Sequence, residues 1–188
     1  LFICIVPEKR KEVTTEGGLN LNYNKIFLKK MIKKLKKNGS RISLFIEPNL
    51  KDISTAKEIN ADCIEIHTGK ICNLINKGKS YKVELKKIKK NSEYAEKLGL
   101  YVHAGHGLTF DNVAPIAAIP QVAELNIGHF LIGEAIFRGL EPAIVEMRRL
   151  MDDAAYVDSV LRTGAEKAND LATPIMKEVQ DLVGFLRP

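Results

Sequence analysis

Two patterns of apolar and polar residues alternate along this chain. Short runs rich in Ile, Val, Leu and Phe are typical of buried strands, and longer stretches with apolar residues three and four positions apart are typical of amphipathic helices. This alternation indicates repeated βα units around a parallel sheet. We expect five strands, at 2–6, 42–47, 63–67, 100–104 and 124–127. Between them we expect helices at 23–37, 51–59, 80–98 and 111–118, and a further helix beginning near Gly128.

The C-terminal part of the chain does not continue this alternation. A helix is expected to begin at Glu141-Pro142 and to end near Met151. Two more helices are expected at 156–168 and 174–183, the second with Thr173-Pro174 at its start. The sequence therefore predicts an α/β protein with extra C-terminal helices.

Composition excludes several classes of protein. The chain of 188 residues has 45% hydrophobic and 28% charged residues, and its apolar runs are far shorter than the roughly 20 residues that cross a bilayer. The opening LFICIV leads directly into charged residues and lacks a cleavage site, unlike a signal peptide. The three cysteines show no zinc-like spacing. We expect a cytoplasmic protein with reduced thiols and no membrane segment.

The net charge of +6 raises the question of nucleic-acid binding. The lysines are concentrated on two amphipathic stretches, 25–37 and 82–97, where solvated helix faces explain them. Nucleic acid is therefore not the expected partner. The first hundred residues are rich in Lys, Asn and Ile, and the rest in Ala, Gly, Arg and Val, which suggests a composite sequence.

Candidate chemistry gathers at the ends of the predicted strands. In a strand at 63–67, Glu65 and His67 share one face, near the C-terminal end where parallel α/β proteins bind ligands. The segment AGHG places His106 between two glycines, where an imidazole near a ligand can transfer a proton. A loop histidine with a purely structural role is the alternative interpretation.

Two further loops have features of a phosphate site. Gly128-His129 opens directly into an apolar helix, and free N–H groups at a helix N-terminus bind anions. The segment EVTTEGGLN, residues 12–20, has hydroxyls and a Gly pair that can surround a phosphate, although an ordinary polar turn explains it equally well. The four histidines lack carboxylate partners at ligand-like spacing, so no metal is expected.

Six segments in this order resemble the pyridoxine 5'-phosphate synthase family. The resemblance covers residues 1 to about 152, and its segments are VPEKRKEVTTEGGLN, SLFIEP, IEIHTG, AGHGLT, NVAPIAAIP and ELNIGHFLIGEAIFRGL. It implies a TIM (β/α)₈ barrel, here represented by about its last five βα units, and assembly as an octamer. It also implies condensation of 3-amino-2-oxopropyl phosphate with 1-deoxy-D-xylulose 5-phosphate in vitamin B6 biosynthesis, without metal or organic cofactor.

The resemblance also assigns roles to single residues. His106 matches the family's proton donor, and Glu65 matches the carboxylate that stabilises the transition state. Thr14 matches a residue that binds the deoxyxylulose phosphate. The site of the amino-ketone phosphate is matched by Gly107, Gly128 and His129.

The chain also departs from the family. Substrate-binding residues and two bases on the family's first three strands have no counterpart here, so we expect an incomplete barrel at 1–152 with negligible turnover on its own. A non-catalytic phosphate-binding half-barrel is the alternative. The tail within 153–188, from residue 157 onward, resembles the C-terminal end of bacterial tryptophanyl-tRNA synthetase, which favours a composite sequence and leaves an RNA-associated tail as a further hypothesis.

Overall fold

The structure, a computed structural model, describes residues 2–7 and 17–152. Thr14 and the helices expected at 156–168 and 174–183 lie outside these residues, so those expectations stay predictions, as does a domain boundary near residue 152. The strands are β1 (Phe2–Ile5), β2 (Arg41–Ile46), β3 (Cys63–His67), β4 (Tyr101–Gly105) and β5 (Val122–Asn126). The helices are α1 (Leu21–Lys36), α2 (Leu50–Glu58), α3 (Gly69–Asn76), α4 (Lys82–Lys97), α5 (Ala114–Ala117), α6 (His129–Arg138) and α7 (Leu140–Asp152).

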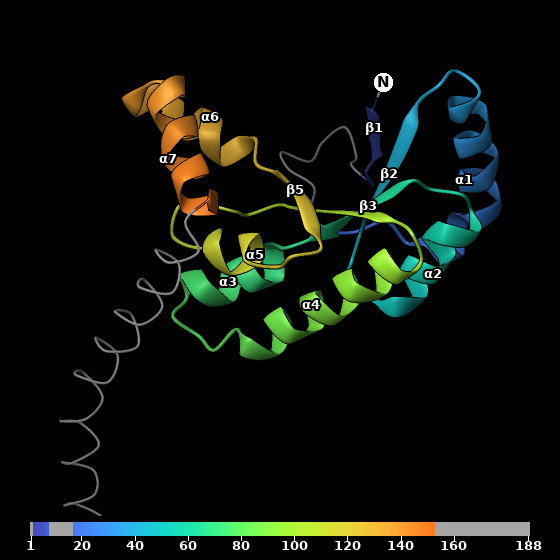
Figure 1. The fold of residues 1–188 in the computed structure, drawn as a ribbon, viewed down its shortest axis with the longest axis horizontal. Helices are drawn as coiled ribbons and strands as arrows, with labels where there is room; N and C mark the ends of the chain where they lie inside the picture. The colour runs from blue at the N-terminus through green and yellow to red at the C-terminus, as the bar shows by residue number, and fades with distance from the viewer. Residues whose placement is uncertain (1, 8–16, 153–188) are drawn as a thin grey trace, which may run out of the picture. The chain divides into compact units, whose positions relative to one another are not determined.

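All five strands are parallel and form one sheet in the order of the sequence, β1-β2-β3-β4-β5. At least one helix follows each strand (Figure 1). Parallel strands that are neighbours in both sequence and space, each followed by a helix, are consistent with a TIM-like fold. The predicted α/β class with a parallel sheet is therefore confirmed.

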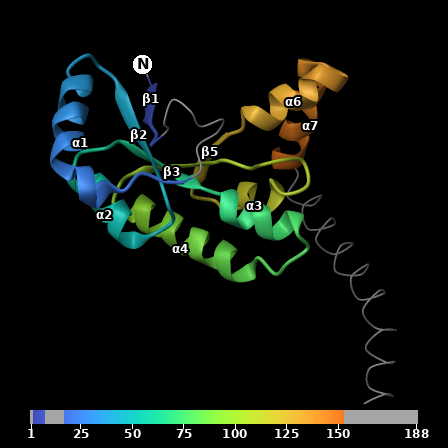
Figure 2. The ribbon, with the colours of Figure 1, turned by 180° about the vertical axis from the view of Figure 1, so that it is seen from behind.

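One face of the sheet carries the hydrophobic core. Successive side chains of a strand point to opposite faces, so every second residue of β2 and β3 lies on this side. Helices α1, α2 and α4 cover it, as the two opposite views show (Figures 1 and 2). Fully buried aliphatic side chains fill the space, among them Ile42, Leu44, Ile46, Ile64 and Ile66 from the strands and Ile32, Ile53 and Ile88 from the helices.

The opposite face of the sheet is more polar. Register pairs Phe45 of β2 with Glu65 of β3, and Glu65 with His103 of β4. Since paired residues of parallel strands point the same way, these side chains form a row across this face. Glu65 and His103 are both buried. A sheet with an apolar helix-covered face and a polar second face supplies a rigid base for a ligand site at its carboxyl edge.

The observed element ends differ from the expected ones by small amounts. The strand at 63–67 coincides with β3, and the other four strands are displaced at their ends by one or two residues. The helix expected at 111–118 is shorter, because α5 covers only Ala114–Ala117. Helix α3, which begins at Gly69, was not expected. It is short, begins with a glycine and has no acidic residue in its first turn, so its sequence signal is weak although Thr68 is a favoured N-cap residue type.

Candidate functional site

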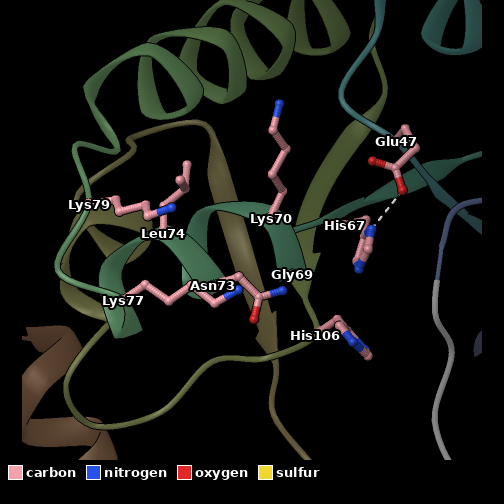
Figure 3. A pocket seen from close by; sticks show the side chains of 9 residues that line it. All are labelled: Glu47, His67, Gly69, Lys70, Asn73, Leu74, Lys77, Lys79 and His106. Atoms are coloured by element: carbon pink, nitrogen blue, oxygen red, sulfur yellow. Dashed lines mark hydrogen bonds and ion pairs between the residues drawn. The ribbon is translucent and has the colours of Figure 1, made fainter.

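The carboxyl ends of β2, β3 and β4 meet at a cavity of about 640 Å³. Glu47 follows β2, His67 ends β3 and His106 follows β4, and all three line the cavity together with the start of α3 (Figure 3). The ends of neighbouring parallel strands lie at the same edge of a sheet, so three separate segments deliver these side chains to one place. The cavity also has lysines at its margin, Lys70, Lys77 and Lys79.

Glu47 and His67 form a close pair in this cavity. His67 Nδ1 lies 2.6 Å from Glu47 Oε1, and the backbone N–H of Gly18 donates to the same oxygen at 3.0 Å. The hydrogen bond with His67 lowers the pKa of the Glu47 carboxyl group, against the opposing effect of partial burial. Glu47 is therefore an ionised acceptor at neutral pH, and it fixes the orientation of the His67 ring.

His106 occupies a backbone conformation that is rare for a residue with a side chain. Its φ is +82°, and the next residue, Gly107, has a φ of +76°. A non-glycine residue in this left-handed region is uncommon and needs support from its surroundings. Thr68 supplies that support, because its hydroxyl lies 2.7 Å from the Gly105 carbonyl oxygen and 2.6 Å from the His106 carbonyl oxygen. The turn projects the imidazole beyond the end of β4.

Asn112 holds the next part of the same loop. This fully buried side chain donates to the Gly107 carbonyl oxygen at 3.1 Å and accepts from the Thr109 N–H at 2.8 Å. It also donates to Asn76 at the end of α3, at 3.2 Å. The loop after β4 is therefore tied to α3 at two places, through Thr68 and through Asn112. Sequence reasoning did not identify either residue.

The two imidazoles of the cavity are in contact. The ring centroids of His67 and His106 lie 4.8 Å apart in an edge-on arrangement. Burial lowers the pKa of His106, the charge of His67 lowers it further, and Glu47 opposes these effects. His106 is therefore disposed to be neutral near pH 7 unless an added negative charge favours its protonated form.

Glu65 lies on the polar face of the sheet, two residues before His67 in β3. It is 8% exposed and accepts hydrogen bonds from Asn126 Nδ2 at 2.7 Å and from Cys4 Sγ at 3.3 Å. Gly105 leaves room for this carboxylate, because a Cβ at that position would lie 2.3 Å from Glu65 Oε1. Glu65 does not line the cavity of His67 and His106. It is instead a buried acceptor on the polar face of the sheet.

The loop after β5 carries Gly128 and His129. Gly128 is the N-cap residue of α6, and no side chain caps this helix, so the N–H groups of its first turn are open to an anion. Both residues are exposed. The ring of Phe130 packs against Phe110 from the loop after β4, with centroids 4.8 Å apart. This contact shows that the loop after β4, which carries Gly107, and the loop after β5, which carries Gly128, are neighbours.

The structure thus places the predicted site residues in three positions. His106 lies in the cavity with Gly107 directly after it, Glu65 lies on the sheet face behind them, and Gly128 and His129 lie at the start of α6. Thr14 is outside the described residues. The sequence analysis noted that His67 shares a strand face with Glu65, but it did not pair His67 with Glu47. The position of Glu47 directly after a buried strand was the signal that could have identified it. Across 2–7 and 17–152, no group of three His, Cys, Asp or Glu could hold a metal ion, and no helix could span a membrane.

Comparison with known proteins identifies close relatives. The sequence model of the family described as "Pyridoxal phosphate biosynthesis protein PdxJ" matches residues 1–153. Proteins named pyridoxine 5'-phosphate synthase are similar to the chain: that of Pelagibacter ubique is 57% identical over 149 residues, covering 79% of this chain and 62% of the relative. That of Ruegeria pomeroyi is 53% identical over 154 residues, covering 81% and 62%. The chain therefore spans about 62% of the length of these relatives.

Proposed function

The chain belongs to the PdxJ family of pyridoxal phosphate biosynthesis proteins, and from this membership we propose that it forms the carboxyl-edge site of a pyridoxine 5'-phosphate synthase. The proposed reaction condenses 3-amino-2-oxopropyl phosphate with 1-deoxy-D-xylulose 5-phosphate and closes the pyridine ring. The observation that carries the proposal is the placement of His106 in a strand-end cavity, beside a second loop with an uncapped helix N-terminus.

His106 is proposed as the proton donor of this reaction. Ring closure and dehydration both require a proton for a departing oxygen, and an imidazole that lines a cavity can supply it. Burial and His67 lower the pKa of His106, so the free site favours the neutral ring. A phosphate bound at Gly107, Gly128 and His129 would add negative charge nearby and favour the protonated ring. His106 would then acquire its proton as the substrate binds.

Glu65 is proposed to stabilise the positive charge that develops on an iminium intermediate. A buried carboxylate acts strongly on a nearby charge, since little water screens it, and the hydrogen bonds from Asn126 and Cys4 hold Glu65 in place. Thr14, in the segment before Gly17-Gly18, is proposed to bind the deoxyxylulose phosphate. No metal or organic cofactor enters this scheme.

We further propose that the five βα units are part of a (β/α)₈ barrel that works in the cytoplasm as a homo-oligomer, an octamer as in the family. The parallel sheet in sequence order and its polar second face support the barrel. Large apolar side chains that are exposed on α6 and α7 support assembly, among them Ile136, Phe137 and Val145. For the 188 residues alone we propose negligible turnover, because the family's bases on earlier strands have no counterpart among them. The alternative is a half-barrel that binds phosphate without catalysis.

A chimera tests this function. It joins the segment of the Pelagibacter ubique relative that precedes its match to this chain with residues 1–188, and formation of pyridoxine 5'-phosphate is measured. We expect the chimera to be active and the 188-residue chain alone to be inactive. His106→Asn in the chimera should reduce kcat by about 10²- to 10⁴-fold. Glu65→Gln should also reduce kcat strongly, while Lys90→Ala on the exposed face of α4 should not. A folded chimera without activity, or with full activity after His106→Asn, would refute the proposal.

A further inference from the structure

His67 is a buried histidine with one nitrogen satisfied and the other free. It is 9% exposed, and its Nδ1 is paired with Glu47 at 2.6 Å. Its Nε2 is buried and has no hydrogen-bond partner among the described residues. Leaving a buried polar atom unsatisfied costs about 1–3 kcal/mol. A histidine that served only to fill the core would normally not carry this cost, so the free nitrogen indicates a role in the site.

The free nitrogen faces His106. Figure 3 shows the Nε2 end of the His67 ring turned toward His106, away from Glu47. Gly69 lies against both rings, because a Cβ at this position would be 2.6 Å from His67 Nε2 and 3.0 Å from His106 Cδ2. With no side chain at position 69, the two imidazoles can approach to a centroid distance of 4.8 Å. The glycine thus permits a direct contact between them.

Glu47 decides which nitrogen of a neutral His67 carries the hydrogen. The Glu47 carboxylate can only accept, and it already accepts from the Gly18 N–H, so the hydrogen of His67 must be on Nδ1. Nε2 then carries a lone pair, at the end of the ring that is turned toward His106. The arrangement of carboxylate, first imidazole and second group is the one by which a carboxylate fixes the tautomer of a catalytic histidine.

We propose that Glu47 and His67 are a positioning pair for His106, in which Glu47 fixes the ring and the tautomer of His67 and the His67 ring orients His106 through their contact. At this separation a positive charge on the His67 ring disfavours a proton on His106, and His67 therefore lowers the pKa of His106. His129 from α6 adds to this repulsion on His106, and Lys87 from α4 acts on Glu47, with Lys70 of α3 also lining the cavity. The inference rests on the proposed function for its catalytic meaning, but the pair itself is a property of the folded chain.

The first test is an NMR titration of the 188-residue chain with ¹⁵N-labelled histidine, which needs no substrate. We expect neutral His67 to have its hydrogen on Nδ1, and we expect His106 to titrate at a pH lower than an ordinary histidine. In His67→Gln the His106 midpoint should rise, on the order of one pH unit. Observation of the Nε2–H tautomer for His67, or an unchanged His106 midpoint in His67→Gln, would overturn the proposal.

His103→Gln is the matched control. His103 is also a buried histidine of this sheet face, but its ring contact is with Phe2 and not with His106. Its substitution should leave the His106 midpoint unchanged, and an equal shift in both variants would overturn the assignment to His67.

The second test is kinetic. In the active chimera, Glu47→Gln should lower kcat more than it changes KM and displace the pH profile, and Glu47→Asp should restore part of kcat. A Glu47→Gln variant with normal kcat and pH profile would also overturn the proposal, whereas an inactive chimera would contradict only the proposed function.

Discussion

Replacing Gly105 by Ala tests whether the sheet face around Glu65 is packed as tightly as the structure indicates. The added Cβ would lie 2.3 Å from Glu65 Oε1, 3.0 Å from the Asn126 carbonyl oxygen and 3.2 Å from Asn126 Cβ. Gly105 does not have a positive φ, so the substitution causes no strain in the backbone itself. The cost comes from displacing the Glu65 carboxylate, which is held by Asn126 and Cys4.

Overpacking of a well-packed interior typically costs about 1–3 kcal/mol, and we expect the free energy of unfolding to fall by this amount. Urea denaturation followed by circular dichroism measures it. The matched control is Gly133→Ala in α6, where an added Cβ meets nothing within 4 Å. Alanine favours a helix interior over glycine by about 0.5–1 kcal/mol, so this control should be slightly stabilised.

A double substitution identifies the cause of the Gly105→Ala effect. Shortening Glu65 to Ala removes the atom that the new Cβ would meet, so Gly105→Ala should cost clearly less in a Glu65→Ala background. The cycle compares four free energies of unfolding. If Gly105→Ala is neutral in the parent chain, or costs the same in both backgrounds, the packing argument for Glu65 is wrong.

Two further predictions concern Thr68 and Cys4. Thr68→Val should lower the free energy of unfolding by about 1–2 kcal/mol in urea denaturation, because the His106 carbonyl oxygen loses its hydroxyl donor. Thr68→Ser keeps a hydroxyl and should retain most of the parent chain's stability. Equal losses of stability in the two variants would contradict the role of the hydroxyl. Cys4 is exposed on an edge strand, yet burial of its thiol and the Glu65 carboxylate raise its pKa to about 12. Iodoacetamide at pH 8.5 should therefore modify Cys4 at least about tenfold more slowly than in the urea-unfolded chain, and equal rates would show that the thiol is not held against Glu65.

The sheet could be predicted from sequence because its strands carry their own signal. The runs at β2 and β3 are short, rich in Ile and bounded by polar residues, and the polar residues of β3 alternate with Ile64 and Ile66. Helix α3 carries a weaker signal. Its N-cap residue, Thr68, uses its hydroxyl to bind the turn after β4 and does not cap the helix. The weakness of the signal lies in the eight-residue length of α3 and in the glycine at its start, since Thr68 itself is a favoured N-cap residue type.

The candidate site was predicted only where a residue's chemistry is visible in its own segment. His106 was identified because glycines flank it and because its segment resembles a family motif. The partners of Glu65 could not be found in this way, since Cys4 and Asn126 are each 61 residues away from it. Asn112 contacts Asn76 across 36 residues, and its role depends on the fold of both segments. Such contacts follow from topology, which a single sequence does not display.

The geometry around His106 also depends on small residues. Gly18 lets its segment approach the end of β2, where a Cβ would lie 2.3 Å from the Glu47 backbone nitrogen, and its own N–H then binds the Glu47 carboxylate. Gly69 admits the two imidazoles in the same way, and Gly107 completes the left-handed turn. Gly18 and Gly69 bring backbone close to Glu47 and to the two imidazoles, which a larger residue would prevent. Close backbone packing therefore acts together with the Glu47–His67 hydrogen bond in orienting the site, and substitutions at these glycines should disturb it even though none of them can transfer a proton.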